Sequence, residues 1–228
     1  MICCENTADA ARNGHLDCIK TIQFKSRVPI AWSTEVKWDS NTTYIAARNG
    51  NLDFLKYVRE AGCPWSDNII QGAIYSGNLD ILKYLHSEGC KWHPKTTLYA
   101  AMSGNLEILK FLNSHNCEFH PYTTYMAARD GHLECLKYLN SQGYDFHSES
   151  ISGAALYGHL DCMKYLYEQC GCKWDYRTAW CSAYNSHLDC LKYLIEGGCE
   201  WNSETIAIAS QHGHIECLKY LNEKNSTK

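Results

Sequence analysis

The segment Ala127-Ala128-Arg129-Asp130-Gly131-His132-Leu133-Glu134 decides the fold, because eight versions of it occur along the 228-residue chain. Most successive versions lie about 27 residues apart, and a fixed period of this length indicates a solenoid of stacked structural units. One extra residue falls around 170–172 and a longer insertion falls within 21–36, and we expect both between helices. The versions centre on Gly14, Gly50, Gly77, Gly104, Gly131, Gly158, Ser186 and Gly213.

Each unit predicts a first helix that ends at the central glycine. An aromatic residue followed by a capping residue, as in Trp174-Asp175, precedes the helix, and we expect the helix to start directly after this pair. The glycine suits the left-handed backbone that ends many helices, so Ser186 should be strained at this position. The aromatic residues are Trp38, Trp65, Trp92, Phe119, Phe146, Trp174 and Trp201.

A second helix begins at the His or Asn after the glycine, and we interpret that residue as its polar cap. Apolar residues such as Leu52, Phe54 and Leu55 cover most of this helix, as expected where it lies between copies of itself. An acid such as Asp53 stands three residues before a Lys such as Lys56 in every unit. This spacing predicts weak ion pairs on a solvated face rather than a charged binding site.

The Ala-Ala-x-x-Gly-His-Leu-Glu run of 127–134 resembles the second half of an ankyrin repeat. The usual ankyrin unit has about 33 residues, with a β-turn finger and a Thr-Pro-Leu-His start, and this chain lacks both. It therefore resembles the shortened variant found in large DNA viruses and protists. The resemblance implies a single all-α, ankyrin-type helix-turn-helix solenoid over 1–228, with eight stacked hairpins and little or no β-finger. The expected repeats are 1–22, 38–63, 65–90, 92–117, 119–144, 146–172, 174–199 and 201–224.

The same resemblance implies a partner-binding surface on the concave side, formed by the first helix of each unit. Two columns of residues vary while the frame around them stays fixed, which indicates freedom from the shared packing role. Tyr, Trp, Met and Arg in these columns suit recognition, although the aromatic residues could equally pack between neighbouring helices. The expected surface comprises Tyr44, Arg48, Gln71, Tyr75, Leu98, Met102, Tyr125, Arg129, Leu156, Tyr157, Trp180, Tyr184 and Gln211.

Composition narrows the class of partner. The formal net charge of -4, from 21 Lys and Arg against 25 Asp and Glu, lacks the basic excess of a nucleic-acid-binding surface. The start has no basic segment before an apolar stretch, and no long apolar run occurs, so we expect neither a signal peptide nor a membrane span. We expect an intracellular, cytoplasmic monomer, in the host cell if the protein is viral.

Cysteine and histidine are numerous but periodic, which indicates packing rather than chemistry. Five of the 14 Cys share one site in the second helix, where Phe54, Ile81 and Ile108 substitute for them, so the site requires a modest apolar group. We predict no metal site and no cofactor, because Cys170 and Cys172 lack further ligands at zinc spacing. No nucleophile motif or phosphate loop occurs, so we expect neither enzyme activity nor a small-molecule substrate.

The sequence therefore favours a non-catalytic scaffold that binds a protein partner. One alternative is a substrate-recruiting arm of a larger complex such as a ubiquitin ligase, since similar viral arrays often adjoin an F-box segment, which this chain does not show. Another is a thiol protein that binds metal or acts in redox chemistry, with Cys170 and Cys172 as its reactive pair.

Overall fold

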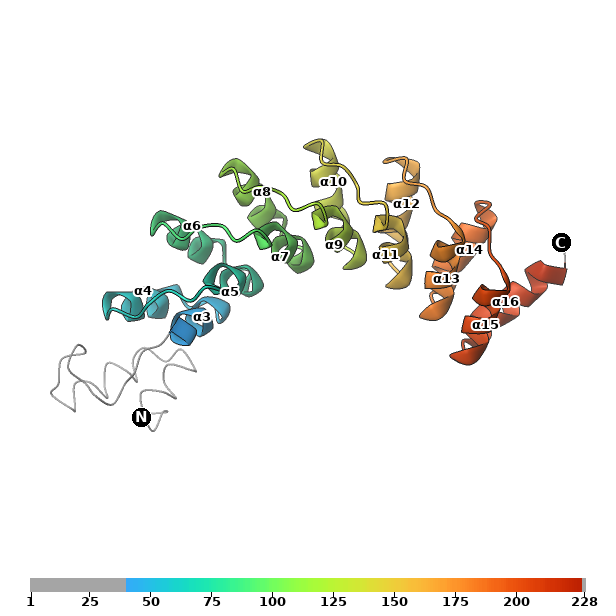
Figure 1. The fold of residues 1–228 in the computed structure, drawn as a ribbon, viewed down its shortest axis with the longest axis horizontal. Helices are drawn as coiled ribbons and strands as arrows, with labels where there is room; N and C mark the ends of the chain where they lie inside the picture. Colours follow the sequence, from blue (N-terminus) through green and yellow to red (C-terminus); the bar gives the residue numbers. More distant parts are fainter. Residues whose placement is uncertain (1–39, 227–228) are drawn as a thin grey trace. The chain divides into compact units, whose positions relative to one another are not determined.

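The computed structural model describes residues 40–226, which form 14 α-helices and no β-strand in that range (Figure 1). Along the chain the helices alternate between a first helix of each unit, called helix A, and a second, called helix B. The described residues belong to two compact units, and the boundary between the units along the chain follows Ser103. The expected first repeat, 1–22, and the insertion within 21–36 lie outside the described residues. No helix within 40–226 is long and apolar enough to cross a bilayer.

The first compact unit contains three helices A and two helices B. Its helices A pack side by side, and each helix B packs on the helix A before it. The helices are α3 (Ser40–Arg48), α4 (Leu52–Glu60), α5 (Ile69–Ser76), α6 (Leu79–Ser87) and α7 (Thr96–Ser103).

The second compact unit contains two layers of helices (Figure 1). Helices α9, α11, α13 and α15 pack in order as the helix A layer, and α8, α10, α12, α14 and α16 pack in order as the helix B layer. The bounds are α8 (Leu106–Ser114), α9 (Thr123–Arg129), α10 (Leu133–Ser141), α11 (Ser150–Leu156), α12 (Leu160–Glu168), α13 (Tyr176–Tyr184), α14 (Leu188–Glu196), α15 (Ser203–Gln211) and α16 (Ile215–Ser226).

The repeated segment determines the fold because its residues form much of the buried core. Ala127 and Ala128 of α9 are fully buried, and their small side chains allow neighbouring helices A to approach closely. On α10, Cys135, Leu136 and Leu139 are buried against the adjacent helices B. The acid and Lys positions of helix B are mostly exposed, so the predicted burial pattern of this helix is confirmed.

The residue after the aromatic caps helix A as predicted in two described units, whereas in four others the helix begins later than predicted. Asp175 and Asn202 are N-caps whose side chains accept hydrogen bonds from Arg177 N and Glu204 N. In four earlier units the equivalent residue forms a turn instead, as where the Nδ1 of His147 accepts from Glu149 N. Helices α5, α7, α9 and α11 therefore begin two residues further along the chain than predicted.

The predicted left-handed helix ends are confirmed throughout the described units. Gly131 has a φ of 81°, and Ser186 adopts a φ of 63°, where a side chain is strained. The same conformation occurs at Gly50, Gly77, Gly104, Gly158 and Gly213.

Candidate functional site

Three histidines that open helix B in the described chain do not cap it, contrary to prediction. His132, His159 and His187 make no side-chain cap hydrogen bond, whereas Asn51, at an equivalent position, accepts from Phe54 N at 2.9 Å. Each of these rings instead packs on the left-handed glycine of the preceding unit. A Cβ on Gly131 would lie 2.4 Å from the Nδ1 of His159. These histidines therefore join neighbouring units and also require glycine at the end of helix A.

Polar side chains near helix B starts also bridge consecutive units through backbone carbonyls. The Nε2 of His214 lies 2.8 Å from the carbonyl oxygen of Tyr184, and the Nδ2 of Asn78 donates to the carbonyl of Gly50 at 3.1 Å. Burial lowers the pKa of His159, and the charges of His132 and His187 act in the same direction, while Asp130 and a hydrogen bond to the backbone of Arg129 oppose this. The described histidines at helix B starts thus have a structural role.

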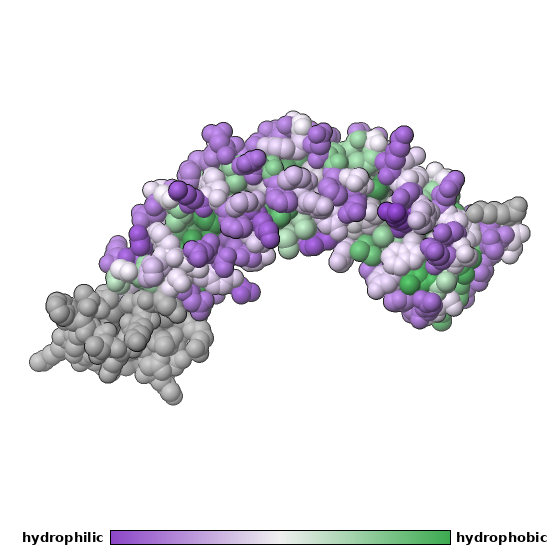
Figure 2. Space-filling model, in the orientation of Figure 1, coloured by the Kyte–Doolittle hydropathy of each residue, from purple (hydrophilic) through white to green (hydrophobic). Residues whose placement is uncertain are grey.

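An aromatic cluster lies at the beginning of helix α9 in the second unit. The rings of Tyr122 and Tyr125 meet edge to face, with centroids 6.0 Å apart, and the ring of His147 lies 4.2 Å from that of Tyr122. Tyr122 is 41% exposed, so the cluster presents ring surface to solvent. Figure 2 shows that hydrophilic residues cover most of the visible surface of the described residues, with hydrophobic residues in small patches between them.

Asp130 holds the guanidinium group of Arg129 in place at the C-terminal end of α9. Arg129 donates from Nε and one terminal nitrogen to the two carboxylate oxygens of Asp130, at 2.7 and 2.9 Å. The same guanidinium lies 5.9 Å from the ring centroid of Tyr157, which is 50% exposed. Because Asp130 pairs with Arg129, this part of the surface offers hydrogen-bonding groups rather than a free positive charge.

A second aromatic group follows on helix α13. Trp180 and Tyr184, one helical turn apart, stack with ring centroids 5.0 Å apart. The ring of His212 lies 4.7 Å from that of Tyr184 and extends the group to the end of α15. Tyr176, at the start of α13, is 41% exposed.

The structure places the sequence-predicted site residues on helices A, except for Tyr157, which directly follows α11. All but one of them are accessible to a partner. Leu98 is only 7% exposed, because it packs within the helix A layer of the first unit, so it offers almost no contact area and is removed from the predicted surface. The first unit contains Tyr44, Arg48, Gln71, Tyr75 and Met102, which are at least partly exposed. The second unit contains Tyr125, Arg129, Leu156, Tyr157, Trp180, Tyr184 and Gln211, also at least partly exposed.

Two tyrosines of the predicted surface also pack between helices. A Cβ on Gly153 would lie 2.8 Å from a ring carbon of Tyr125, and one on Gly72 would lie 3.1 Å from a ring carbon of Tyr44. Glycine inside a helix is unfavourable by about 1 kcal/mol relative to alanine, so a close neighbour is its usual reason. The mid-helix glycines were the signal in the sequence for this packing. Tyr122, His147 and Tyr176 were missed because the variable columns do not include them.

The acid and Lys pairs of helix B form in only part of the described chain. Lys83, Lys110, Lys137 and Lys219 lie within 3.4 Å of the acid three residues earlier. In other units the ammonium lies over a tyrosine of the next unit, as where Lys164 stands 5.5 Å from the ring centroid of Tyr193. This face is a solvated surface with contacts between repeats.

The cysteines of the described chain show no reactive or metal-binding arrangement. All described cysteines are free, and residues 40–226 contain no group of three or more His, Cys, Asp or Glu placed to hold a metal. Burial raises the pKa of Cys162 to about 12, and burial together with the charge of Cys172 raises the pKa of Cys170 to about 11. Such thiols are poor nucleophiles near neutral pH.

Comparison with known proteins identifies the repeat. Residues 70–150 and 151–228 each match the family model described as ankyrin repeats (3 copies). No curated protein matches the chain.

Proposed function

Because the chain belongs to the ankyrin repeat family, we propose that it is a non-catalytic scaffold that binds a protein partner on helices α9, α11, α13 and α15. Ankyrin repeats are generally protein–protein interaction modules. We call the exposed side of these four helices the helix A face. The function of such a module lies in surface complementarity rather than in bond chemistry.

The observation that carries the proposal is the exposed aromatic surface of the helix A face. Tyr122, Tyr157 and Tyr176 leave much of their ring area open, and Trp180 and Tyr184 extend this area. Tyr and Trp are enriched at the centres of protein interfaces because they contribute a large contact area with few rotatable bonds. The helix B side, by contrast, carries Lys and acid side chains, which interfaces tend to exclude from their centres.

The proposal includes three finer points. We assign the chain to the shortened ankyrin variant, because its repeat is shorter than the usual unit of about 33 residues and the described chain contains no strand. We place it in the cytoplasm, where the free described cysteines would persist. We expect it to act as a monomer, with the helix A face open to the partner.

The test removes aromatic area from the helix A face without touching the tyrosines packed on glycine. A triple variant with Tyr157→Ala, Trp180→Ala and Tyr184→Ala should capture a specific protein from cell extract at least tenfold less than the parent chain, since central interface aromatics often contribute about 2 kcal/mol each. Quantitative mass spectrometry of immobilised chains measures this loss.

The matched control is a triple Lys→Ala variant on the helix B layer, at 137, 164 and 192. It should capture the same protein as the parent. Equal capture by the folded aromatic variant, or loss of capture in the Lys variant alone, would contradict the assignment of the surface. Circular dichroism and thermal unfolding establish that each variant is folded.

A further inference from the structure

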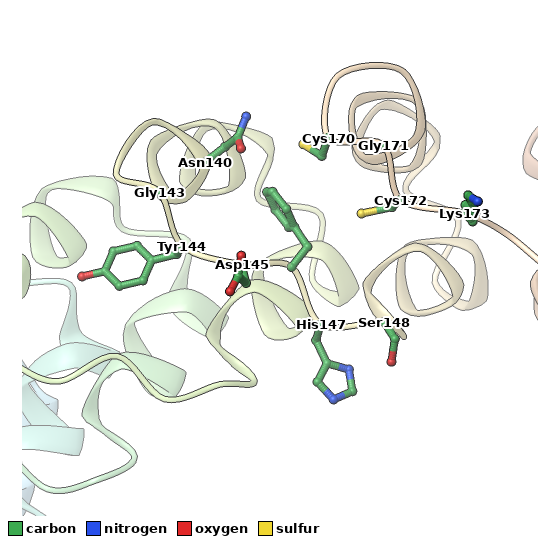
Figure 3. Close-up of a pocket in the computed structure, with 11 residues that line it drawn as sticks. Asn140, Gly143, Tyr144, Asp145, His147, Ser148, Cys170, Gly171, Cys172 and Lys173 are labelled. Atoms are coloured by element: carbon green, nitrogen blue, oxygen red, sulfur yellow. The ribbon is translucent and has the colours of Figure 1, made fainter.

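A hollow of about 650 Å³ lies between two consecutive connectors of the second unit. The first connector, residues 142–149, joins α10 to α11, and the second, residues 169–175, joins α12 to α13. Residues 143–148 form one wall and residues 170–173 form the other (Figure 3). A second hollow, of about 450 Å³, lies on the other side of the first connector and is lined by Thr124. His147 of the aromatic cluster borders both hollows, and the larger hollow extends from it between the connectors.

The first connector has backbone groups without partners on the side of the larger hollow. The hydroxyl of Thr124 donates to the carbonyl of Asp145 at 3.3 Å and accepts from His147 N at 3.1 Å, so these groups face the smaller hollow. Phe146 lies between them, and its N–H and carbonyl make no hydrogen bond within residues 40–226. Successive backbone groups of an extended segment point to opposite edges. The N–H and carbonyl of Phe146 therefore face the larger hollow.

The second connector lacks the hydroxyl that Thr43 and Thr124 place against the connectors of their own units. In the first unit the hydroxyl of Thr43 donates to the carbonyl of Pro64 at 3.0 Å and accepts from Ser66 N at 3.1 Å, as Thr124 does in its own unit. The equivalent of Thr124 before the second connector is Ile151, which is buried and has no polar group. The carbonyl of Lys173, the equivalent of the Pro64 carbonyl, consequently has no hydrogen-bond partner in the described chain, and the N–H of Lys173 has none either.

The distance between the connectors of successive repeats leaves room for one additional β-strand between them. Packed helices lie about 8–10 Å apart, and connectors of successive units follow the same spacing. Paired β-strands lie about 4.8 Å apart, so a strand placed midway between two connectors would be at hydrogen-bonding distance from both. The unpartnered N–H and carbonyl groups of Phe146 and Lys173 thus lie on opposite sides of the larger hollow, which is wide enough for one strand.

We propose that this hollow binds an extended, uncharged segment of a partner polypeptide, which pairs its backbone with Phe146 and Lys173. Main-chain pairing to an open edge supplies affinity, and the lining side chains supply selectivity. Cys170 and Cys172 direct their sulfur atoms toward the first connector (Figure 3), and Asp145 and Lys173 balance each other in charge. Neutral thiols and balanced charges favour a segment with small, uncharged side chains.

The test uses peptides selected from a displayed library of random extended sequences on the intact chain. A selected peptide should shift the backbone amide signals of 145–148 and 171–174 in a two-dimensional NMR titration. Methylation of alternate peptide nitrogens should weaken binding about three- to tenfold per lost backbone hydrogen bond. Shifts confined to the helix A face, failure to select any peptide, or indifference to methylation would overturn the proposal.

Two variants taken from the chain's own repeats test the same pairing from the protein side. Lys173→Pro removes one unpartnered N–H, and Pro64 shows that a proline is accepted at this position, so affinity should fall about three- to tenfold. Ile151→Thr restores the hydroxyl that Thr124 supplies, which should compete with the peptide and weaken its binding. Lys91→Pro, the same change in the first compact unit, is the matched control and should leave affinity unchanged. Equal affinity in all three folded variants would contradict the proposal.

Discussion

Replacing Gly131 by Ala tests the contact that joins successive units. Gly131 has a φ of 81°, and an added Cβ would lie 2.4 Å from the ring of His159. Gly143 has a φ of 77° but nothing within 4 Å of an added Cβ. Both substitutions carry the left-handed penalty of about 1–2 kcal/mol, and only Gly131→Ala adds an overlap of about 1–3 kcal/mol. Gly131→Ala should therefore reduce the free energy of unfolding by about 2–5 kcal/mol.

Urea unfolding followed by far-ultraviolet circular dichroism measures both variants against the parent. The effect of the overlap should be largely relieved by His159→Asn, because Asn occupies this position in three other described units and is shorter than His. The double variant should recover at least about 1 kcal/mol relative to the sum of the single changes. Equal destabilisation by Gly131→Ala and Gly143→Ala, within about 0.5 kcal/mol, would refute the role of the histidine.

Three further predictions concern other single positions. Burial lowers the pKa of His159, so the contribution of its neutral ring to the free energy of unfolding is present above about pH 6.5 and lost as pH falls below that value. In unfolding experiments at a series of pH values, His159→Asn should lose less free energy of unfolding than the parent over this range. Ser186→Gly should raise the free energy of unfolding by up to about 1 kcal/mol in urea titrations, since it removes left-handed strain, and a decrease would contradict this. Cys162→Ile should be tolerated, as Ile81 shows at the same site, whereas Cys162→Ser should be destabilising by about 1–3 kcal/mol in the same assay.

The helical units could be predicted because their signals are local. A glycine directly after a helical run favours a left-handed end of the helix, whatever fold the rest of the chain adopts. Gly131 has this conformation, and so does Ser186 at the same place in its repeat. The burial of Cys135 followed from comparing the repeats, since apolar residues alternate with cysteine at that site. The regular spacing of the repeated segment then implied a stack of similar helix pairs.

The contacts between repeats could not be predicted from one unit alone. His159 was assigned to its own helix because a polar residue at a helix start normally caps it, yet its ring packs on Gly131 of the preceding unit. Lys164 was assigned to an acid three residues away, yet it lies over Tyr193 of the next unit. In each case a partner in the neighbouring unit competes with a local one, and only the packed geometry decides between them.

The candidate surface was predicted in part. Variation between repeats identifies positions free of a shared packing role, but it does not separate exposure from burial, which is why Leu98 was included. It also passes over positions before the helix, such as Tyr122 and His147, whose rings meet only in the folded chain. The open backbone edge of Lys173 was missed because Ile151 occupies the position at which Thr124 bonds to its connector, and this pairing shows only in the folded chain.

Hydrogen–deuterium exchange of the chain with and without its captured protein partner tests the central claim most directly. Binding should slow exchange in α9, α11 and α13 and in the turns that precede them, and leave α10, α12 and α14 unchanged. Protection confined to the helix B layer, with unchanged exchange in the helix A layer, would contradict the account.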